Sequence, residues 1–276
     1  MMHYTRMHGA GNSFVVIENR NGELDGTDLS ALAVRLCAET GESKADGMMI
    51  VLPGDAEADF GMLFYNSDGT PGEMCGNGAR CIVRYGLEHG YAPDAQNIRV
   101  RATAGLVTGR RIEGEIFEIR LNDPTVVDLH RAAEAAGRTY DCAYLELGCP
   151  GLPHAVVEVE ESALDDLDAL RVLGRELRRS PAFPKGANVT FVHRTGLSAA
   201  RALTFARGVE DFTLACGTGC GCTAAAMILR GRVPGNSLEI DMPGGHLSVR
   251  LTPENGTARD IYLTGPTAVV GEGEIE

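Results

Sequence analysis

One eight-residue phrase occurs twice in this chain. Residues 74–81 read MCGNGARC and residues 215–222 read ACGTGCGC. Each phrase opens a stretch with a helical pattern, and Cys216 follows Cys75 by 141 residues (216 − 75). Looser matches keep nearly the same spacing in chain order: residues 11–17 with 151–157, 47–51 with 187–191, and 98–105 with 238–245. The sequence therefore predicts two copies of one fold, related by approximate two-fold symmetry, with a cleft between them.

Short runs of alternating apolar residues dominate both halves, as expected for strands with one buried face. Helical patterns are fewer, and strands do not alternate regularly with helices, which argues against a doubly wound nucleotide-binding fold. We expect an α+β protein of two pseudo-symmetric domains, each a strand-rich barrel or sheet around a central helix. The predicted helices are Leu29–Ala38 (with Asp28 as N-cap), Gly76–Gly90, Leu167–Leu177 and Gly217–Arg230. The predicted strands are Phe14–Glu18, Gly47–Leu52, Phe60–Tyr65, Ile98–Ala102, Phe117–Leu121, His154–Val159, Val189–His193, Ala202–Phe205, Ser237–Met242, His246–Leu251 and Ile261–Thr264.

The domain boundary is expected near Asp123-Pro124, between two strand-rich blocks. The N-terminal domain would span residues 1–122 and carry Cys75, and the C-terminal domain would span 123–265 and carry Cys216. Residues 266–276 are expected to pack back on the first domain. A chain of 276 residues that is 44% hydrophobic can bury the cores of two such domains.

Charge and composition restrict the partners. The net charge of −13 argues against nucleic acid and anionic membranes, since both would repel the protein. No apolar segment follows Met1 as a signal peptide would require, and no apolar run is long enough to span a membrane. The expected location is cytoplasmic, and the expected partner is a small amino-acid substrate; a homodimer is left open.

In a cytoplasmic protein the cysteines should be reduced. Six of them are interpreted as small buried hydrophobes: Cys37, Cys81, Cys142, Cys149, Cys220 and Cys222.

A thiol at a helix start suggests specific chemistry. The first backbone N–H groups of a helix are unpaired, lower the pKa of a nearby thiol and suit a carboxylate. If Cys75 and Cys216 face one substrate, a thiolate can remove the α-proton while the opposite thiol delivers a proton to the other face. That reaction inverts the α-carbon without a cofactor, as in a racemase or epimerase.

Cofactor and metal chemistry fit the sequence less well. Pyridoxal phosphate needs a lysine, and Lys44 and Lys185 are the only lysines. Lys185 lies in a loop without an evident phosphate-binding site nearby. The run at residues 9–14, GAGNSF, begins like a dinucleotide loop but leads into a strand and lacks the third glycine. The spacing of Cys216, Cys220 and Cys222 is not that of a zinc site. We expect no cofactor and no metal, although zinc or an iron–sulfur cluster is the strongest rival.

The sequence resembles the diaminopimelate epimerase family. The resemblance runs in family order over most of the chain, and its most specific stretch is the first cysteine phrase. The matching stretches are residues 7–14 (MHGAGNSF), 64–69 (FYNSDG), 73–81 (EMCGNGARC), 153–154 (PH), 188–189 (NV), 207–208 (RG) and 215–219 (ACGTG).

The resemblance implies two domains that close on the substrate and a role for each matching residue. Cys75 and Cys216 would be the acid and base, and His154 would tune the thiols. Carboxylate and amine of the reacting centre would be held by Gly76, Asn77, Gly217 and Thr218. The distal amino-acid end would be recognised by Asn12, Asn66, Asn188 and Arg207.

Three positions depart from the family pattern. Leu152 stands where Asn usually precedes Pro-His, Ala206 stands where Glu usually precedes Arg-Gly, and Ser13 replaces the usual Asp. Glu210 or Asp211 could supply the missing carboxylate. These departures leave three functions open: a diaminopimelate epimerase of lysine and cell-wall synthesis, a related racemase for another amino acid such as histidine, and a non-catalytic amino-acid-binding protein.

Overall fold

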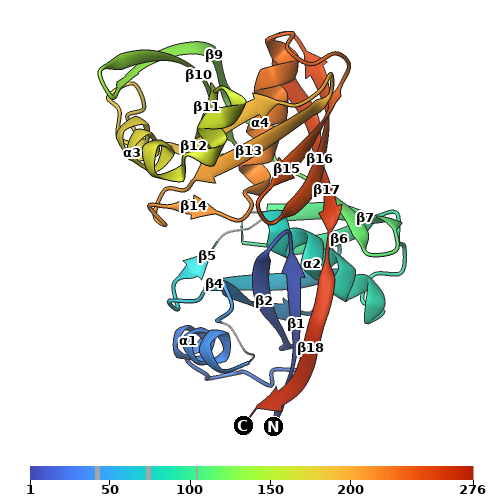
Figure 1. Ribbon diagram of the computed structural model, residues 1–276. Coiled ribbons are helices and arrows are strands. Elements are labelled where there is room, and N and C mark those ends of the chain that lie inside the picture. Colours follow the sequence, from blue (N-terminus) through green and yellow to red (C-terminus); the bar gives the residue numbers. More distant parts are fainter. Residues whose placement is uncertain (41–43, 73–75, 104, 276) are drawn as a thin grey trace. The chain divides into compact units, whose positions relative to one another are not determined.

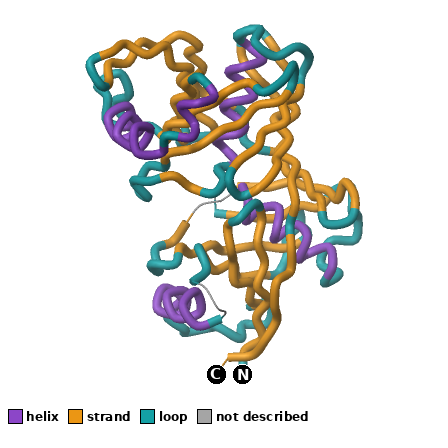
Figure 2. The backbone as a smooth tube through the Cα atoms, in the orientation of Figure 1, coloured by secondary structure: helices purple, strands orange, loops and turns teal. Residues whose placement is uncertain are grey.

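The computed structural model describes residues 1–40, 44–72, 76–103 and 105–275. The chain forms two compact units, Met1–Ile119 with Thr264–Glu276 and Arg120–Leu263 (Figure 1). Figure 2 shows that strands predominate in both. Within the described ranges, none of the helices combines the length and apolar character needed to cross a membrane.

The first unit is a curved set of strands around a buried helix. Strand β2 pairs antiparallel with β1 and parallel with β3, and β4 pairs antiparallel with β3 and parallel with β6. The last strand, β18, pairs with β1 from Met2↔Ile275 to His8↔Ala268. Its elements are β1 (Met2–Gly9), β2 (Asn12–Glu18), α1 (Leu29–Glu39), β3 (Gly47–Leu52), β4 (Phe60–Asn66), β5 (Pro71–Gly72), α2 (Gly76–Glu88), β6 (Ile98–Ala102), β7 (Gly105–Glu113), β8 (Ile116–Arg120) and β18 (Ala268–Ile275).

The second unit repeats this order of pairings. Strand β11 pairs antiparallel with β10 and parallel with β12, and β13 pairs antiparallel with β12 and parallel with β15. Its elements are β9 (Pro124–Ala135), β10 (Arg138–Leu147), β11 (Leu152–Glu158), η1 (Glu161–Asp165), α3 (Leu167–Arg178), β12 (Asn188–Arg194), β13 (Ala199–Phe205), β14 (Phe212–Thr213), α4 (Gly217–Leu229), β15 (Ser237–Met242), β16 (Gly245–Glu254) and β17 (Thr257–Pro266).

The internal duplication predicted from the sequence is confirmed by these pairings. In each unit one helix connects the two parallel strands of the first pair, α1 between β2 and β3 and α3 between β11 and β12. A second helix comes before the last strand of the second parallel pair. Helix α2 precedes β6, which pairs with β4, and α4 precedes β15, which pairs with β13. The predicted α+β class is therefore correct.

The two central helices differ from the two peripheral ones in composition. Helix α4 is buried from Gly217 to Ile228 apart from Thr218. Its own residues are small or apolar on every face, so every face of the helix can be buried. Helix α2 is buried from Gly76 to Gly86. The peripheral helices bury one face, and Asp28 caps α1 as predicted by accepting hydrogen bonds from the backbone N–H groups of Ser30 and Ala31. The central helices therefore bring their N-terminal residues into fixed positions.

Five of the six cysteines interpreted as buried hydrophobes are buried: Cys37, Cys81, Cys142, Cys220 and Cys222. The prediction was wrong for Cys149, which is exposed. Cys149 lies in the turn that joins β10 to β11, where no apolar layer covers it. Burial raises the pKa of the Cys37 thiol to about 11 and that of the Cys142 thiol to about 12, so these thiols stay protonated at neutral pH.

Candidate active site

Cys216 is the N-cap of α4. Its backbone is extended (φ −132°, ψ 105°), and its half-buried Sγ accepts the N–H of Gly219 at 3.3 Å. The hydroxyl Oγ1 of Thr218 lies 3.6 Å from the same sulfur. Because the N–H groups at a helix start carry partial positive charge, this position favours the thiolate.

Gly219 allows the start of α4 to approach the sheet. A Cβ at this position would lie 3.1 Å from the hydroxyls of Thr190 and Thr204 and 3.2 Å from the Cβ of Cys216. The two threonine hydroxyls, on β12 and β13, lie 3.0 Å apart and form a buried hydrogen bond. The glycine therefore places the thiol directly against these strands. Gly219 lies in one of the stretches that match the family, whereas neither threonine does.

His154 lies on β11 and contacts Thr218. Its side chain is fully buried, and Nε2 lies 3.0 Å from Thr218 Oγ1. Burial, reinforced by the positive charge of Arg207, lowers the pKa of His154 to about 3. The imidazole is therefore neutral at physiological pH.

The tautomer of His154 follows from its surroundings. Among the residues that the structure describes, no hydrogen-bond partner is found for Nδ1. A buried N–H without an acceptor is less common than a buried acceptor without a donor. We therefore assign the proton to Nε2, which donates to the Thr218 hydroxyl. That hydroxyl is then left to donate its own proton toward the sulfur of Cys216.

Asn188 and Arg207 lie at the same end of the sheet. Asn188 stands beside His154 in the parallel pair of β11 and β12. Its side-chain oxygen accepts the backbone N–H of Arg207 at 2.8 Å, and its Nδ2 lies 3.4 Å from the carbonyl of Pro153. The guanidinium of Arg207 donates to the carbonyl of Lys185 at 3.0 Å. The second unit thus joins five of its six predicted residues through side-chain contacts and strand pairing: Cys216, Thr218, His154, Asn188 and Arg207. The sixth, Gly217, is the first residue of α4 and directly follows Cys216.

The first unit holds a matching group at the start of α2. Asn77 is fully buried, donates to Oδ1 of Asn12 at 2.7 Å and accepts from Arg80 at 3.0 Å. Asn12 also approaches Asp46, with Nδ2 3.4 Å from Oδ2. Close packing requires Gly9, because a Cβ there would lie 2.9 Å from the carbonyl of Asn77. The structure therefore joins Asn12 to Asn77, two of the predicted residues.

Asn66 ends β4 and makes local contacts. Its side chain donates to the Thr70 hydroxyl at 3.0 Å, and its backbone N–H donates to the Thr70 carbonyl at 2.9 Å. Gly76 begins α2, and its carbonyl lies 3.5 Å from Nη1 of Arg80. Cys75 lies outside the described residues, directly before this helix.

Ser13, which departs from the family pattern, and the two carboxylates considered as replacements for a missing one, Glu210 and Asp211, have identifiable partners. Ser13 accepts a hydrogen bond from Arg6 at 2.6 Å and donates its N–H to Asp46 at 2.8 Å. Glu210 pairs with Arg178 at 2.5 Å, and Asp211 pairs with Arg171 at 2.9 Å. Both arginines belong to α3, so each carboxylate is engaged by that helix.

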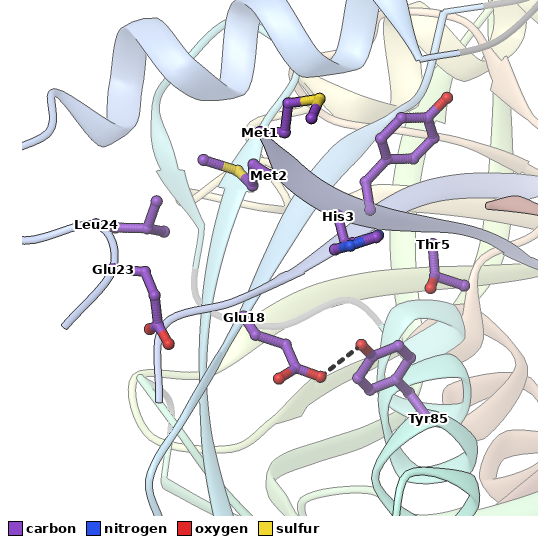
Figure 3. Close-up of a pocket in the computed structure, with 9 residues that line it drawn as sticks. Met1, Met2, His3, Thr5, Glu18, Glu23, Leu24 and Tyr85 are labelled. Atoms are coloured by element: carbon purple, nitrogen blue, oxygen red, sulfur yellow. Dashed lines mark hydrogen bonds between the residues drawn. The ribbon is translucent and has the colours of Figure 1, made fainter. Parts of the chain in front are cut away.

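A cavity of about 450 Å³ in the first unit does not contain the predicted site residues (Figure 3). Glu18 and Tyr85 lie side by side in it, and the tyrosine hydroxyl donates to the carboxylate at 2.8 Å. The residues that line the cavity are Met1, Met2, His3, Tyr4, Thr5, Glu18, Glu23, Leu24 and Tyr85.

In the part of the chain that is described, no group of three or more His, Cys, Asp or Glu side chains is arranged to hold a metal ion.

Solved structures of other proteins share the fold of this chain. A probable proline racemase from Agrobacterium radiobacter K84 superposes with a TM-score of 0.69 at 18% identity, covering 100% of this chain and 93% of that one. A PhzF-family phenazine biosynthesis protein from Bacillus anthracis gives a TM-score of 0.74 at 14% identity, covering 100% and 99%. The chain thus has the duplicated fold shared by these proteins.

Sequence relatives define the family. The model of the family described as diaminopimelate epimerase matches residues 4–116 and 149–270. The diaminopimelate epimerase of Carboxydothermus hydrogenoformans is 32% identical, with 99% of each chain covered. That of Chlorobaculum tepidum is 34% identical, with 98% of this chain and 99% of the relative covered. The chain belongs to the diaminopimelate epimerase family.

Proposed function

We propose that this protein interconverts LL- and meso-diaminopimelate by inverting one α-carbon, with Cys216 and Cys75 as the two proton-transfer groups. The observation that carries the proposal is the environment of Cys216. Its sulfur caps a buried helix, accepts one backbone N–H and lies beside one hydroxyl. These donors stabilise the thiolate that is needed to remove an α-proton.

The second thiol is supplied by the duplication. Cys75 directly precedes α2, as Cys216 directly precedes α4. In one direction the Cys216 thiolate takes the α-proton and becomes a thiol, while the Cys75 thiol donates its proton to the opposite face and becomes a thiolate. The number of protons is conserved, and the reverse reaction exchanges the two roles. No step requires an oxidant or a cofactor.

His154 acts in this scheme through Thr218. Because burial lowers the pKa of the imidazole to about 3, it is too weak a base to serve as a proton acceptor in the reaction. Its Nε2–H orients the Thr218 hydroxyl, which donates to the Cys216 sulfur when that sulfur is negatively charged. This relay of hydrogen bonds, from His154 through Thr218 to the Cys216 sulfur, adds a second donor to a thiolate that already accepts the Gly219 N–H.

The remaining predicted residues are proposed to bind the substrate. The backbone N–H groups at Gly76-Asn77 and Gly217-Thr218 belong to helix starts and suit the carboxylate of the reacting centre. Arg207 provides a guanidinium for the distal carboxylate. Asn188 would act by fixing the backbone of Arg207, and Asn12 and Asn66 would provide amide groups from the first unit. A cytoplasmic location is also proposed, since both thiols must stay reduced to react.

A second candidate is a racemase for another amino acid. Leu152 is half-buried and, two residues before His154 on β11, lies on the same face of the strand. An apolar side chain there favours a substrate with a less polar distal end than diaminopimelate.

Proton NMR in heavy water separates the candidates. The protein is incubated with a panel that contains LL-diaminopimelate, histidine and other amino acids, and the loss of each α-proton signal is followed. We expect exchange with diaminopimelate. Exchange with another amino acid alone would favour the second candidate, and binding without any exchange would contradict an epimerase.

A further inference from the structure

A buried carboxylate lies on the strand next to His154. Glu146, near the end of β10, stands directly opposite Pro153, and its side chain is 6% exposed. It accepts the Tyr144 hydroxyl at 2.6 Å and pairs with the Lys185 ammonium at 2.7 Å. Burial raises the pKa of Glu146, but the bonds from Lys185 and Tyr144 outweigh it and hold the pKa below its usual range. The carboxylate is therefore ionised at neutral pH.

The surrounding residues fix this carboxylate in place. A Cβ on Gly151 would lie 2.5 Å from Oε2 and 2.6 Å from Cβ of Glu146, so glycine leaves the room that the side chain occupies. Tyr144 is buried, and its ring stacks on Phe183 with centroids 5.4 Å apart. The guanidinium of Arg131 lies 4.1 Å from the same ring. Glu146 is thus a rigid acceptor rather than a mobile surface acid.

Lys185 links this acceptor to Arg207. Its carbonyl accepts the Arg207 guanidinium at 3.0 Å, while its ammonium binds Glu146. The loop that carries Lys185 is a tight turn, in which Gly186 has φ +66° and donates its N–H to Phe183 at 2.7 Å. The Cδ of Arg207 lies 3.7 Å from where a Cβ on Gly186 would be. The orientation of the guanidinium therefore depends on where this loop is held.

We propose that Glu146 and Lys185 are positioning residues for Arg207, and that they help the enzyme recognise a substrate with a carboxylate remote from the reacting carbon. The inference rests on the proposed function, which assigns that carboxylate to Arg207. A guanidinium held on a fixed carbonyl is oriented before the substrate arrives, so less freedom is lost on binding. Without the bond to Glu146, the loop and Arg207 can take other orientations.

Steady-state kinetics with diaminopimelate test the proposal. Lys185→Met should raise KM about tenfold and leave kcat within about twofold. The Arg207 guanidinium would be misplaced, and it binds the remote carboxylate of the substrate and not the reacting carbon. Glu146→Gln should do the same. Lys185→Arg should restore most of the loss, because it keeps the positive charge. The Lys185 side chain is 61% exposed, so its substitution leaves the core intact. Glu158→Gln is the matched control. It removes a carboxylate on β11 that pairs with Arg230 and Arg232, and it should leave KM and kcat unchanged.

A double-mutant cycle separates positioning from general destabilisation. In an Arg207→Ala background, Lys185→Met should change KM by less than about twofold, because its effect passes through Arg207. An equal rise in KM with and without Arg207, or a fall in kcat at constant KM, would overturn the proposal. Wild-type protein that does not invert diaminopimelate would instead contradict the proposed function, and the cycle would then use the amino acid that it does invert.

Discussion

His154 and Thr218, 64 residues apart in sequence, are joined by a hydrogen bond of 3.0 Å between Nε2 and Oγ1. The same hydroxyl lies 3.6 Å from the sulfur of Cys216. A fully buried, neutral histidine therefore reaches the thiol through an intermediate hydroxyl. We therefore propose that the Thr218 hydroxyl, the donor nearest the sulfur, stabilises the thiolate, and that the imidazole orients this hydroxyl.

Thr218→Val should lower kcat by about 10- to 100-fold, because a donor to the developing thiolate is lost while the shape of the side chain is kept. The pH dependence of alkylation by iodoacetamide should show a raised pKa for the Cys216 thiol. Thr218→Ser should restore most of the activity. Thr223→Val is the matched control, since that hydroxyl binds the carbonyl of Gly219 at 2.8 Å and not the sulfur. Unchanged thiol reactivity in Thr218→Val would contradict the relay.

Gly219→Ala should reduce both activity and thermal stability. The added methyl would lie 3.1 Å from two buried hydroxyls, so the start of α4 has to move and carry Cys216 with it. Gly196→Ala is the control, because the nearest atom there is the Cβ of Ala199 at 3.5 Å, an ordinary contact. Thermal unfolding and the exchange assay measure the two effects. Equal behaviour of the two alanine variants would show that the close approach at Gly219 is unimportant.

The buried His154 should make the protein less stable as the solution becomes acidic. Its pKa is lowered from 6.5 to about 3 in the folded state, so the unfolded chain binds the proton more readily. The free energy of unfolding that it contributes is fully present above about pH 6.5 and is lost as the pH falls toward 3. Urea unfolding at pH 7, 6 and 5 should therefore show a steeper loss for wild type than for His154→Gln. Parallel curves would show that the histidine is not buried in neutral form.

His246 should have the opposite pH dependence. Its hydrogen bond to Asp241, with a further bond to Glu239, raises its pKa above 6.5 despite some desolvation. The stabilisation is fully present below about pH 6.5 and is lost as the pH rises through the raised value. The imidazole is exposed, so the effect should not exceed about 1 kcal/mol. His246→Gln should narrow the difference in unfolding free energy between pH 6 and pH 9, and an unchanged difference would contradict the ion-pair account.

The duplication could be predicted from the sequence because both copies keep a cysteine phrase and the same strand order. The edges of the sheets were harder to predict. Residues 132–136 read AAEAA, which favours a helix, yet they end β9 and enter its turn to β10. The turn is formed by Ala136 (φ +49°) and Gly137 (φ +70°), and pairing along β10 outweighs the local preference. Strand β18, with the sequence AVVGEGEI, is mostly exposed and lacks the apolar alternation of a strand with one buried face.

The candidate site could be predicted only in part, for a related reason. Cysteine phrases are local and visible in sequence, whereas contacts between distant side chains are not. The bond between Glu146 and Lys185 spans 39 residues, and neither residue is part of a motif. Thr190 and Thr204 alternate like ordinary strand residues, and only the approach of Gly219 gives them a role. Glu210 and Asp211 had been considered as substitutes for a missing carboxylate, but the structure pairs both with arginines of α3.

Variants that each lack one of the two proposed catalytic cysteines test the two-thiol mechanism most directly. Cys75→Ala and Cys216→Ala are each incubated in heavy water with LL- and with meso-diaminopimelate, and epimerisation is followed alongside the circular dichroism of the folded protein. Both variants should stay folded and lose at least about 1,000-fold of the epimerisation rate, since inversion needs a proton-transfer group on each face. Either variant retaining more than about a tenth of the wild-type rate would contradict the two-thiol mechanism.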